Sequence, residues 1–230
     1  MSNNDTATNN NNNTVHNTNT IHIELTDGSP LAPDDPRVLA ARGVQLIRAI
    51  LARVTDDAGA DPTPCDEWNV LELSRHAVSV MDRAAAAPSG VDIMAMPRLA
   101  DVDVAGLDDA ATESARRLHE AWNDDAALEL SFSMPWGDMN GAQLLATYAN
   151  ELLVHSWDLA TALDLVVDWP ERDAELFLRI AHSTVPGEVR GGFVPFGPVV
   201  GVHDGAPAID RLVAWEGRDV AAWPTPTSPD

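Results

Sequence analysis

Lysine is absent from the sequence, and cysteine occurs once. All 14 basic residues are therefore arginines, against 36 acidic residues, and the formal net charge is −22. A field of this sign repels phosphate backbones, which argues against nucleic acid as a partner. The single cysteine, Cys65, cannot form a disulfide within the chain.

Long apolar runs are also missing. No stretch approaches the roughly 18 residues of a membrane span, and the N-terminus lacks the basic and apolar regions of a signal peptide. We therefore expect a cytoplasmic protein with no membrane partner.

Asn and Thr dominate the first residues, which offer little apolar surface to offset the entropy of ordering. We expect a disordered tail over 1–30, in which the alternation of 21–25 hints at a short strand. After this tail we expect a single domain over 31–224 and a frayed C-terminus over 225–230.

Apolar stripes of helical period indicate a mainly all-α fold. Strict alternation from Leu128 to Met134 predicts a half-exposed strand before the fourth main helix. Glycine and proline make the extension after Val185 irregular, with a possible short strand at 199–202. The expected helices are 33–56, capped by Asp34 or Asp35; 69–87, capped by Asn69 with Glu72; 108–124; 140–163; 169–182; and 206–216.

Three polar side chains fall on inward-facing helix positions. Glu151 and His155 are four residues apart, with Cβ atoms roughly 6 Å apart, and His76 faces inward from the second helix. Buried polar groups need a partner. A divalent metal ion would satisfy all three, because three protein ligands are usual for catalytic zinc. A Glu151–His155 hydrogen bond is the simpler alternative.

Other candidates have equally simple alternatives. Asp158 could orient the His155 ring or be an ordinary helix carboxylate. Trp68 and Trp157 could line a substrate pocket, but core packing is the simpler interpretation. Arg190 could bind a carboxylate or lie on the surface. We expect Cys65 to be a structural thiol, since no base neighbours it in sequence.

The flanking residues resemble a known family. We expect Pro62 to Trp68 to be an extended lead-in to the second helix. Its residues Thr63-Pro64-Cys65-Asp66-Glu67-Trp68, followed eight residues later by His76, resemble the second-helix signature of DinB-like metal-binding bundles. More narrowly, Glu151-x3-His155-Ser156-Trp157-Asp158-Leu159-Ala160 resembles the E-x3-H-G-W-D-L-A segment of the mycothiol-dependent maleylpyruvate isomerase group and its actinobacterial relatives. Phe196-Gly197-Pro198 and Gly217-Arg218-Asp219 are similar to its C-terminal pattern.

The resemblance implies a DinB-like four-helix bundle with zinc, or another divalent metal, on His76, Glu151 and His155. It also implies an isomerase or S-transferase that acts on a small electrophile and uses mycothiol or a similar small thiol as cosubstrate. The protein would be a monomer or a homodimer. The catalytic residues stay open. The alternatives are a non-catalytic metal- or ligand-binding module and a metal-dependent hydrolase with Glu151 as base. Asp66-Glu67 departs from the commoner Pro-Gly and makes the approach to the site more negative.

The composition of the tail generates a first prediction. Removal of Met1 to Asn19 should leave the melting temperature and the metal content unchanged, because a polar Asn-rich segment has little apolar surface to dock. Thermal denaturation and metal analysis of the truncated protein check this. A fall of several degrees would show that the segment is held against the domain.

Overall fold

The computed structural model describes residues 20–21, 31–185, 187–188, 190 and 196–226. Within this part, the strands are β1 (Thr20–Ile21), β2 (Ser131–Met134), β3 (Gly137–Asn140) and β4 (Val166–Val167). The helices are α1 (Pro36–Leu51), α2 (Val70–Ala86), α3 (Leu107–Ala121), α4 (Asp125–Leu128), α5 (Gly141–Ala162), α6 (Glu171–Thr184) and α7 (Ala208–Trp215), with 3-10 turns at Ala87–Ser89 and Val104–Gly106.

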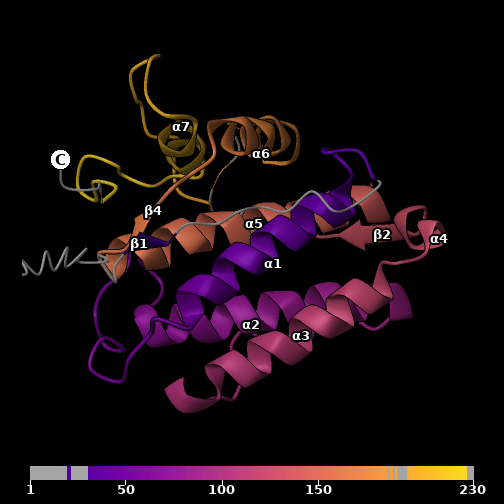
Figure 1. Ribbon diagram of the computed structural model, residues 1–230. Helices are drawn as coiled ribbons and strands as arrows, with labels where there is room; N and C mark the ends of the chain where they lie inside the picture. Colours follow the sequence, from indigo (N-terminus) through magenta and orange to yellow (C-terminus); the bar gives the residue numbers. More distant parts are fainter. Residues whose placement is uncertain (1–19, 22–30, 186, 189, 191–195, 227–230) are drawn as a thin grey trace, which may run out of the picture.

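Helices α1, α2, α3 and α5 form a four-helix bundle (Figure 1). Helix α5 packs against both α1 and α2, and α3 closes the bundle against α2. Helices α6 and α7 pack together on the other side of α5 (Figure 1). The expected fold is confirmed: a mainly helical bundle, a hairpin before its fourth main helix and a C-terminal extension.

Side-chain caps explain where the main helices begin. Asp35 accepts a hydrogen bond from the Arg37 N–H at the start of α1, as the sequence predicts. Asn69 and Glu72 form the expected reciprocal capping box at the start of α2. Asn140 and Gln143 form a second box before α5. These bonds satisfy backbone donors that a helix leaves unpaired in its first turn.

Gly43 lets α1 approach α5 closely. A Cβ atom at this position would lie 3.0 Å from the Ala149 carbonyl oxygen and 3.2 Å from the Leu152 Cβ. The helix backbones therefore meet where a side chain would separate them. This contact holds the middle of α5, beside Glu151, against α1.

The predicted strand from Leu128 starts too early. Asp124 caps a short helix by accepting from the Ala126 N–H, so Leu128 ends α4. Leu130 is 39% exposed, and strand β2 begins only at Ser131. A helix cap and helix-forming alanines outweigh the apolar alternation here. Strand β2 then pairs antiparallel with β3.

The predicted strand at 199–202 is wrong, because these residues adopt no regular structure. The Val200 N–H instead donates to the Ala214 carbonyl at the end of α7. Near the N-terminus, Thr20 and Ile21, within the expected tail, form β1 parallel to β4. Ile21 is buried in the core. The remaining residues of the strand expected at 21–25 lie outside the described part.

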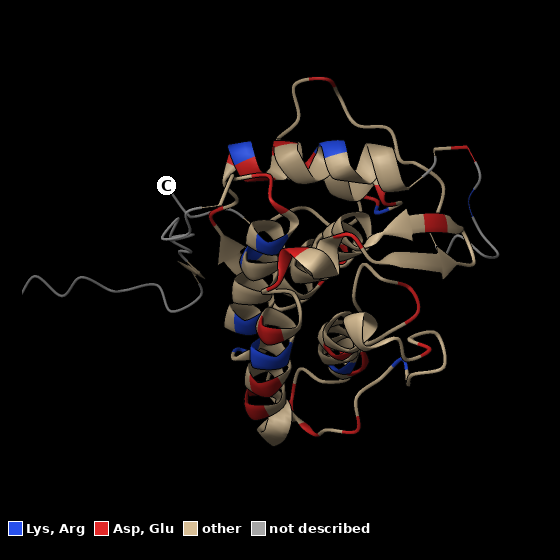
Figure 2. Ribbon diagram, turned by 90° about the vertical axis from the view of Figure 1, so that its right-hand side faces the viewer, with Lys and Arg blue, Asp and Glu red and all other residues tan. Residues whose placement is uncertain are grey.

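Acidic residues lie on helices and loops alike over the face shown in Figure 2, and arginines are sparser there. This distribution agrees with the net charge of the chain. Among the described residues, none of the helices combines the length and the apolar character that a membrane span requires.

A buried polar pair joins α7 to α5. The Glu216 side chain is fully buried and accepts one hydrogen bond, at 2.9 Å, from the Asn150 amide nitrogen. In the described part of the chain, Glu216 Oε2 and Asn150 Oδ1 have no partner. Both are acceptors, so a proton on the Glu216 carboxyl supplies the missing donor. Burial raises the pKa of Glu216 to about 7.

This pair predicts a pH-dependent stability. Between pH 4.5 and about 7 the folded protein retains a proton on Glu216 that the unfolded chain loses, so stability falls as pH rises through this window. The total loss is about 3 kcal/mol at 1.36 kcal/mol per pKa unit. Glu216→Gln, which keeps an N–H donor, should remove this loss and be the more stable protein at pH 8.

Urea denaturation of both proteins at pH 5 and pH 8 measures the effect. The exposed Glu129 provides a matched control, because Glu129→Gln should follow the wild-type pH profile. Identical profiles for Glu216→Gln and the wild type would contradict the assignment of the proton to Glu216.

Candidate metal centre

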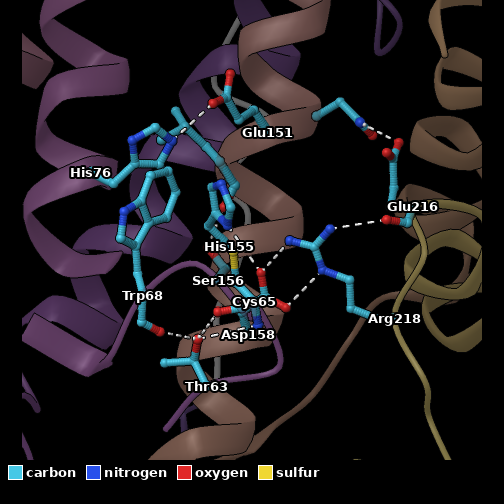
Figure 3. A network of polar contacts seen from close by, with 12 residues as sticks. Thr63, Cys65, Trp68, His76, Glu151, His155, Ser156, Asp158, Glu216 and Arg218 are labelled. Atoms are coloured by element: carbon cyan, nitrogen blue, oxygen red, sulfur yellow. Dashed lines mark hydrogen bonds and ion pairs between the residues drawn. The ribbon is translucent and has the colours of Figure 1, made fainter. Parts of the chain in front are cut away.

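Three nitrogen and oxygen donors from two helices converge at the interface of α2 and α5 (Figure 3). One ligand atom each of His76, Glu151 and His155 lies within 4.8 Å of the other two. His76 Nε2 is 3.1 Å from Glu151 Oε1, and the two imidazole rings lie 5.1 Å apart between centroids. The arrangement is that of the predicted ligand set.

His76 is held by the loop that follows α2. Its Nδ1 lies 2.8 Å from the Arg98 carbonyl oxygen, and its ring packs against Trp68 at 4.0 Å. Since Arg98 O and Glu151 are both acceptors, Nδ1 carries a proton, and Nε2 needs either a second proton or a cation. A metal ion at Nε2 would fill that role.

His155 is held by a buried chain of charges. Its Nδ1 lies 3.0 Å from Asp158 Oδ2, and Asp158 accepts two further bonds from Arg218, at 3.0 and 2.7 Å. Burial lowers the pKa of His155, although the bond to Asp158 opposes the shift. A neutral ring with its proton on Nδ1 leaves the Nε2 lone pair available to a ligand.

The third donor is ionised and partly accessible. Burial alone would raise the pKa of Glu151, but the hydrogen bond and charge of His76 lower it overall. The Glu151 side chain is 32% exposed, whereas the histidines are buried. The donor set is therefore open to solvent on the Glu151 side.

The expected extended lead-in to α2 is instead a closed loop. Pro62 pairs with Asn69 across it, and the buried Thr63 hydroxyl lies 2.8 Å from the Trp68 carbonyl. The loop brings Cys65 within 4.8 Å of ligand atoms of His155 and Asp158. Cys65 thus has a neighbouring base that its position in the sequence does not reveal.

The remaining predicted residues occupy different places. Trp68 lies against His76 and is half-buried. Trp157 is fully buried in the core, and its indole N–H donates to Thr225. Arg190 lies over the rings of Trp215 and Phe196 near the end of α7. Sequence reasoning assigned no role to Arg218, although the Gly217-Arg218-Asp219 pattern pointed to that segment.

The donor chemistry fits a divalent cation. Two imidazole nitrogens and one carboxylate match the ligand types of zinc, and three protein ligands leave a position for water or substrate. Each histidine has its second nitrogen held by an acceptor, the usual support for a metal-bound imidazole. Arg98 adds to this support through its carbonyl, with its guanidinium 4.8 Å from the Trp68 ring.

Comparisons with known proteins identify relatives of this chain. The family model described as the mycothiol maleylpyruvate isomerase N-terminal domain matches residues 40–160, more than half of the chain. Two uncharacterised proteins of Mycobacterium tuberculosis, from strains CDC 1551 / Oshkosh and ATCC 25618 / H37Rv, are each 29% identical over 187 residues, which are 81% of this chain and 99% of theirs.

A likeness to a solved structure concerns the fold alone. The crystal structure of a mutant of the mycothiol-dependent maleylpyruvate isomerase aligns with a TM-score of 0.50 at 18% identity, over 69% of each chain. The helical bundle observed here is thus of the same kind.

The geometry predicts about one divalent metal ion per chain, with zinc preferred. His76→Ala and His155→Ala should each lower the occupancy sharply, because each removes one of three ligands. Elemental analysis of the purified proteins measures this, with the exposed His119→Ala as a control that keeps its metal. Full occupancy in either ligand variant would rule out the proposed set.

Proposed function

The chain belongs to the mycothiol maleylpyruvate isomerase N-terminal domain family, and on that premise we propose that it is a zinc-dependent enzyme. It uses mycothiol, or a similar small thiol, to isomerise a small electrophile or to transfer the thiol to it. The convergence of His76, Glu151 and His155 at one point between α2 and α5 is the observation that carries this proposal.

The chain's residues would bind and orient the reactants. Zinc bound by the three donors would supply a Lewis acid that favours the thiolate form of a small thiol at neutral pH. Trp68 and the exposed side of Glu151 border the approach to the donors. Asp158 fixes the orientation of His155, so that the ring cannot turn when a ligand binds.

The chemistry needs no nucleophile from the protein. In isomerisation, the external thiolate adds to an activated double bond, the adduct rotates about the resulting single bond, and the thiol leaves unchanged. In transfer, the carbon–sulfur bond remains. Burial raises the pKa of Cys65 to about 11, so this thiol stays protonated at neutral pH and is a poor nucleophile.

Two variants separate an external thiol from Cys65 as the nucleophile. Cys65→Ser should keep most of any thiol-dependent activity. Glu151→Gln should lose it, because a neutral amide is a poorer ligand and changes the charge at the metal. The measurement is isomerisation of the electrophile, together with consumption of thiol, over a panel of electrophiles, with and without added mycothiol.

The same assay tests the proposal as a whole. An inactive Cys65→Ser protein that still binds metal would end the proposed mechanism. Metal-loaded wild-type protein that neither isomerises nor attaches thiol to any electrophile would instead favour a non-catalytic binding module.

A further inference from the structure

A groove lies between helices α1 and α3. It has a volume of about 610 Å³, which is in the range of sites that hold small molecules. Its lining comes from α1 and α3, with Leu145 of α5 and Leu31 before α1, and it includes none of the three proposed metal donors. The groove is therefore separate from the candidate metal centre, and the thiol chemistry proposed there makes no use of it.

Two arginines lie near opposite ends of the groove. Arg37 Nη1 donates to Asp125 Oδ1 at 2.7 Å, just beyond the end of α3, and Arg48 Nη2 donates to Thr112 Oγ1 at 2.6 Å, near its start. Helices α1 and α3 thus run antiparallel here. Eleven residues of α1 separate the two arginines, or about 16 Å of helix, so the groove is long enough for an extended chain.

Small side chains keep the space between these arginines open. Ala41 on α1 is exposed, and Ala49 on α1 and Ala115 on α3 are half-buried. Beneath them lies a floor of buried apolar side chains, which consists of Val44, Leu118, Trp122 and Leu145. A hydrocarbon chain laid along this floor would be removed from water on its inner side, which favours binding in proportion to the apolar area buried.

One end of the groove carries a cation without an acidic partner. Arg48 makes its one hydrogen bond to Thr112 and forms no ion pair among the described residues, and its buried Nε has no hydrogen-bond partner there. The other arginines of the lining, Arg37 and Arg42, are each paired with aspartate. In a chain of net charge −22, Arg48 is thus a local positive charge that an anionic group could neutralise.

We propose that this groove binds a single-chain amphiphile with a carboxylate head, of the fatty-acid class. The carboxylate pairs with Arg48, and the chain lies along the apolar floor towards Arg37. Charge complementarity favours this occupant over larger ones. An anionic membrane surface or the helix of a second, equally acidic copy would bring many negative charges against an acidic protein, whereas a single head group meets only the local cation.

Decanoate, decanol and acetate separate the contributions of head and chain by calorimetric titration at pH 8. Decanoate should bind more tightly than decanol, and acetate should show no binding. Arg48→Gln should weaken decanoate binding by about tenfold, as expected for a lost charge-assisted bond, and should change decanol binding by less than about twofold. Arg53→Gln is the matched control, because it removes the same charge at an exposed position outside the lining.

A second pair of variants tests the place of binding. Ala41→Trp should abolish binding of decanoate and decanol, because the indole would fill the groove. Ala52→Trp introduces the same side chain at an exposed position outside the lining and should bind both as the wild type does. If Ala41→Trp fails to fold, the contrast between Arg48→Gln and Arg53→Gln still decides the question.

Several results would overturn the proposal. These are no decanoate binding by the wild type, equal losses in the Arg48 and Arg53 variants, and unchanged binding in a folded Ala41→Trp protein. Analytical ultracentrifugation adds one more. A wild-type dimer that Ala41→Trp converts to monomers, while Ala52→Trp does not, would assign the groove to a second copy of the chain.

Discussion

The buried carboxylate of Asp158 is the constraint on which the site and the C-terminal segment both depend. It is fully buried on α5 and pairs with His155 on one side and Arg218 on the other. Removing one partner of a buried ion pair typically costs about 3–5 kcal/mol, because the other charge stays uncompensated. The Arg218 segment must therefore return to α5 for the bundle to be stable, and the His155 ring is oriented by the same contact.

Helix α5 links this constraint to the rest of the fold. Its backbone meets α1 at Gly43, and its polar face carries Tyr148, Glu151 and His155 towards α2. The opposing His76 is held independently, by the Arg98 carbonyl and the Trp68 ring. The donors converge because two separately supported helices pack together, so the geometry of the site is a consequence of bundle packing and not of one flexible loop.

The parts of the structure that local chemistry determines could be predicted from the sequence. Asn69 with Glu72 marked the start of α2, and the apolar stripes gave the four main helices within a few residues. The four-residue spacing of Glu151 and His155 placed them on one face. Their meeting with His76 rested on the inward orientation of each helix and on the resemblance of the flanking residues.

Other features depend on partners distant in the chain. Arg218 lies 60 residues after Asp158, and no periodicity connects the two. Cys65 approaches His155 only because Thr63 closes the loop before α2. The alternation from Leu128 suggested a strand for a different, local reason, because apolar spacing carries no information about the Asp124 cap on the Ala126 N–H. For Arg218 and Cys65, contacts between segments distant in the chain decided the outcome, and composition could not indicate them.

The segment matched by the family model ends before the residue that neutralises Asp158. Residues 40–160 include Asp158 and all three proposed metal donors, but they end before Arg218. The matched bundle alone would leave Asp158 buried without its cation, and His155 would then share its proton with an unneutralised carboxylate. Burial of that charge is unfavourable, so the bundle would have to hydrate this end of α5. The smallest unit that supports the site therefore includes α6, α7 and the segment that carries Arg218.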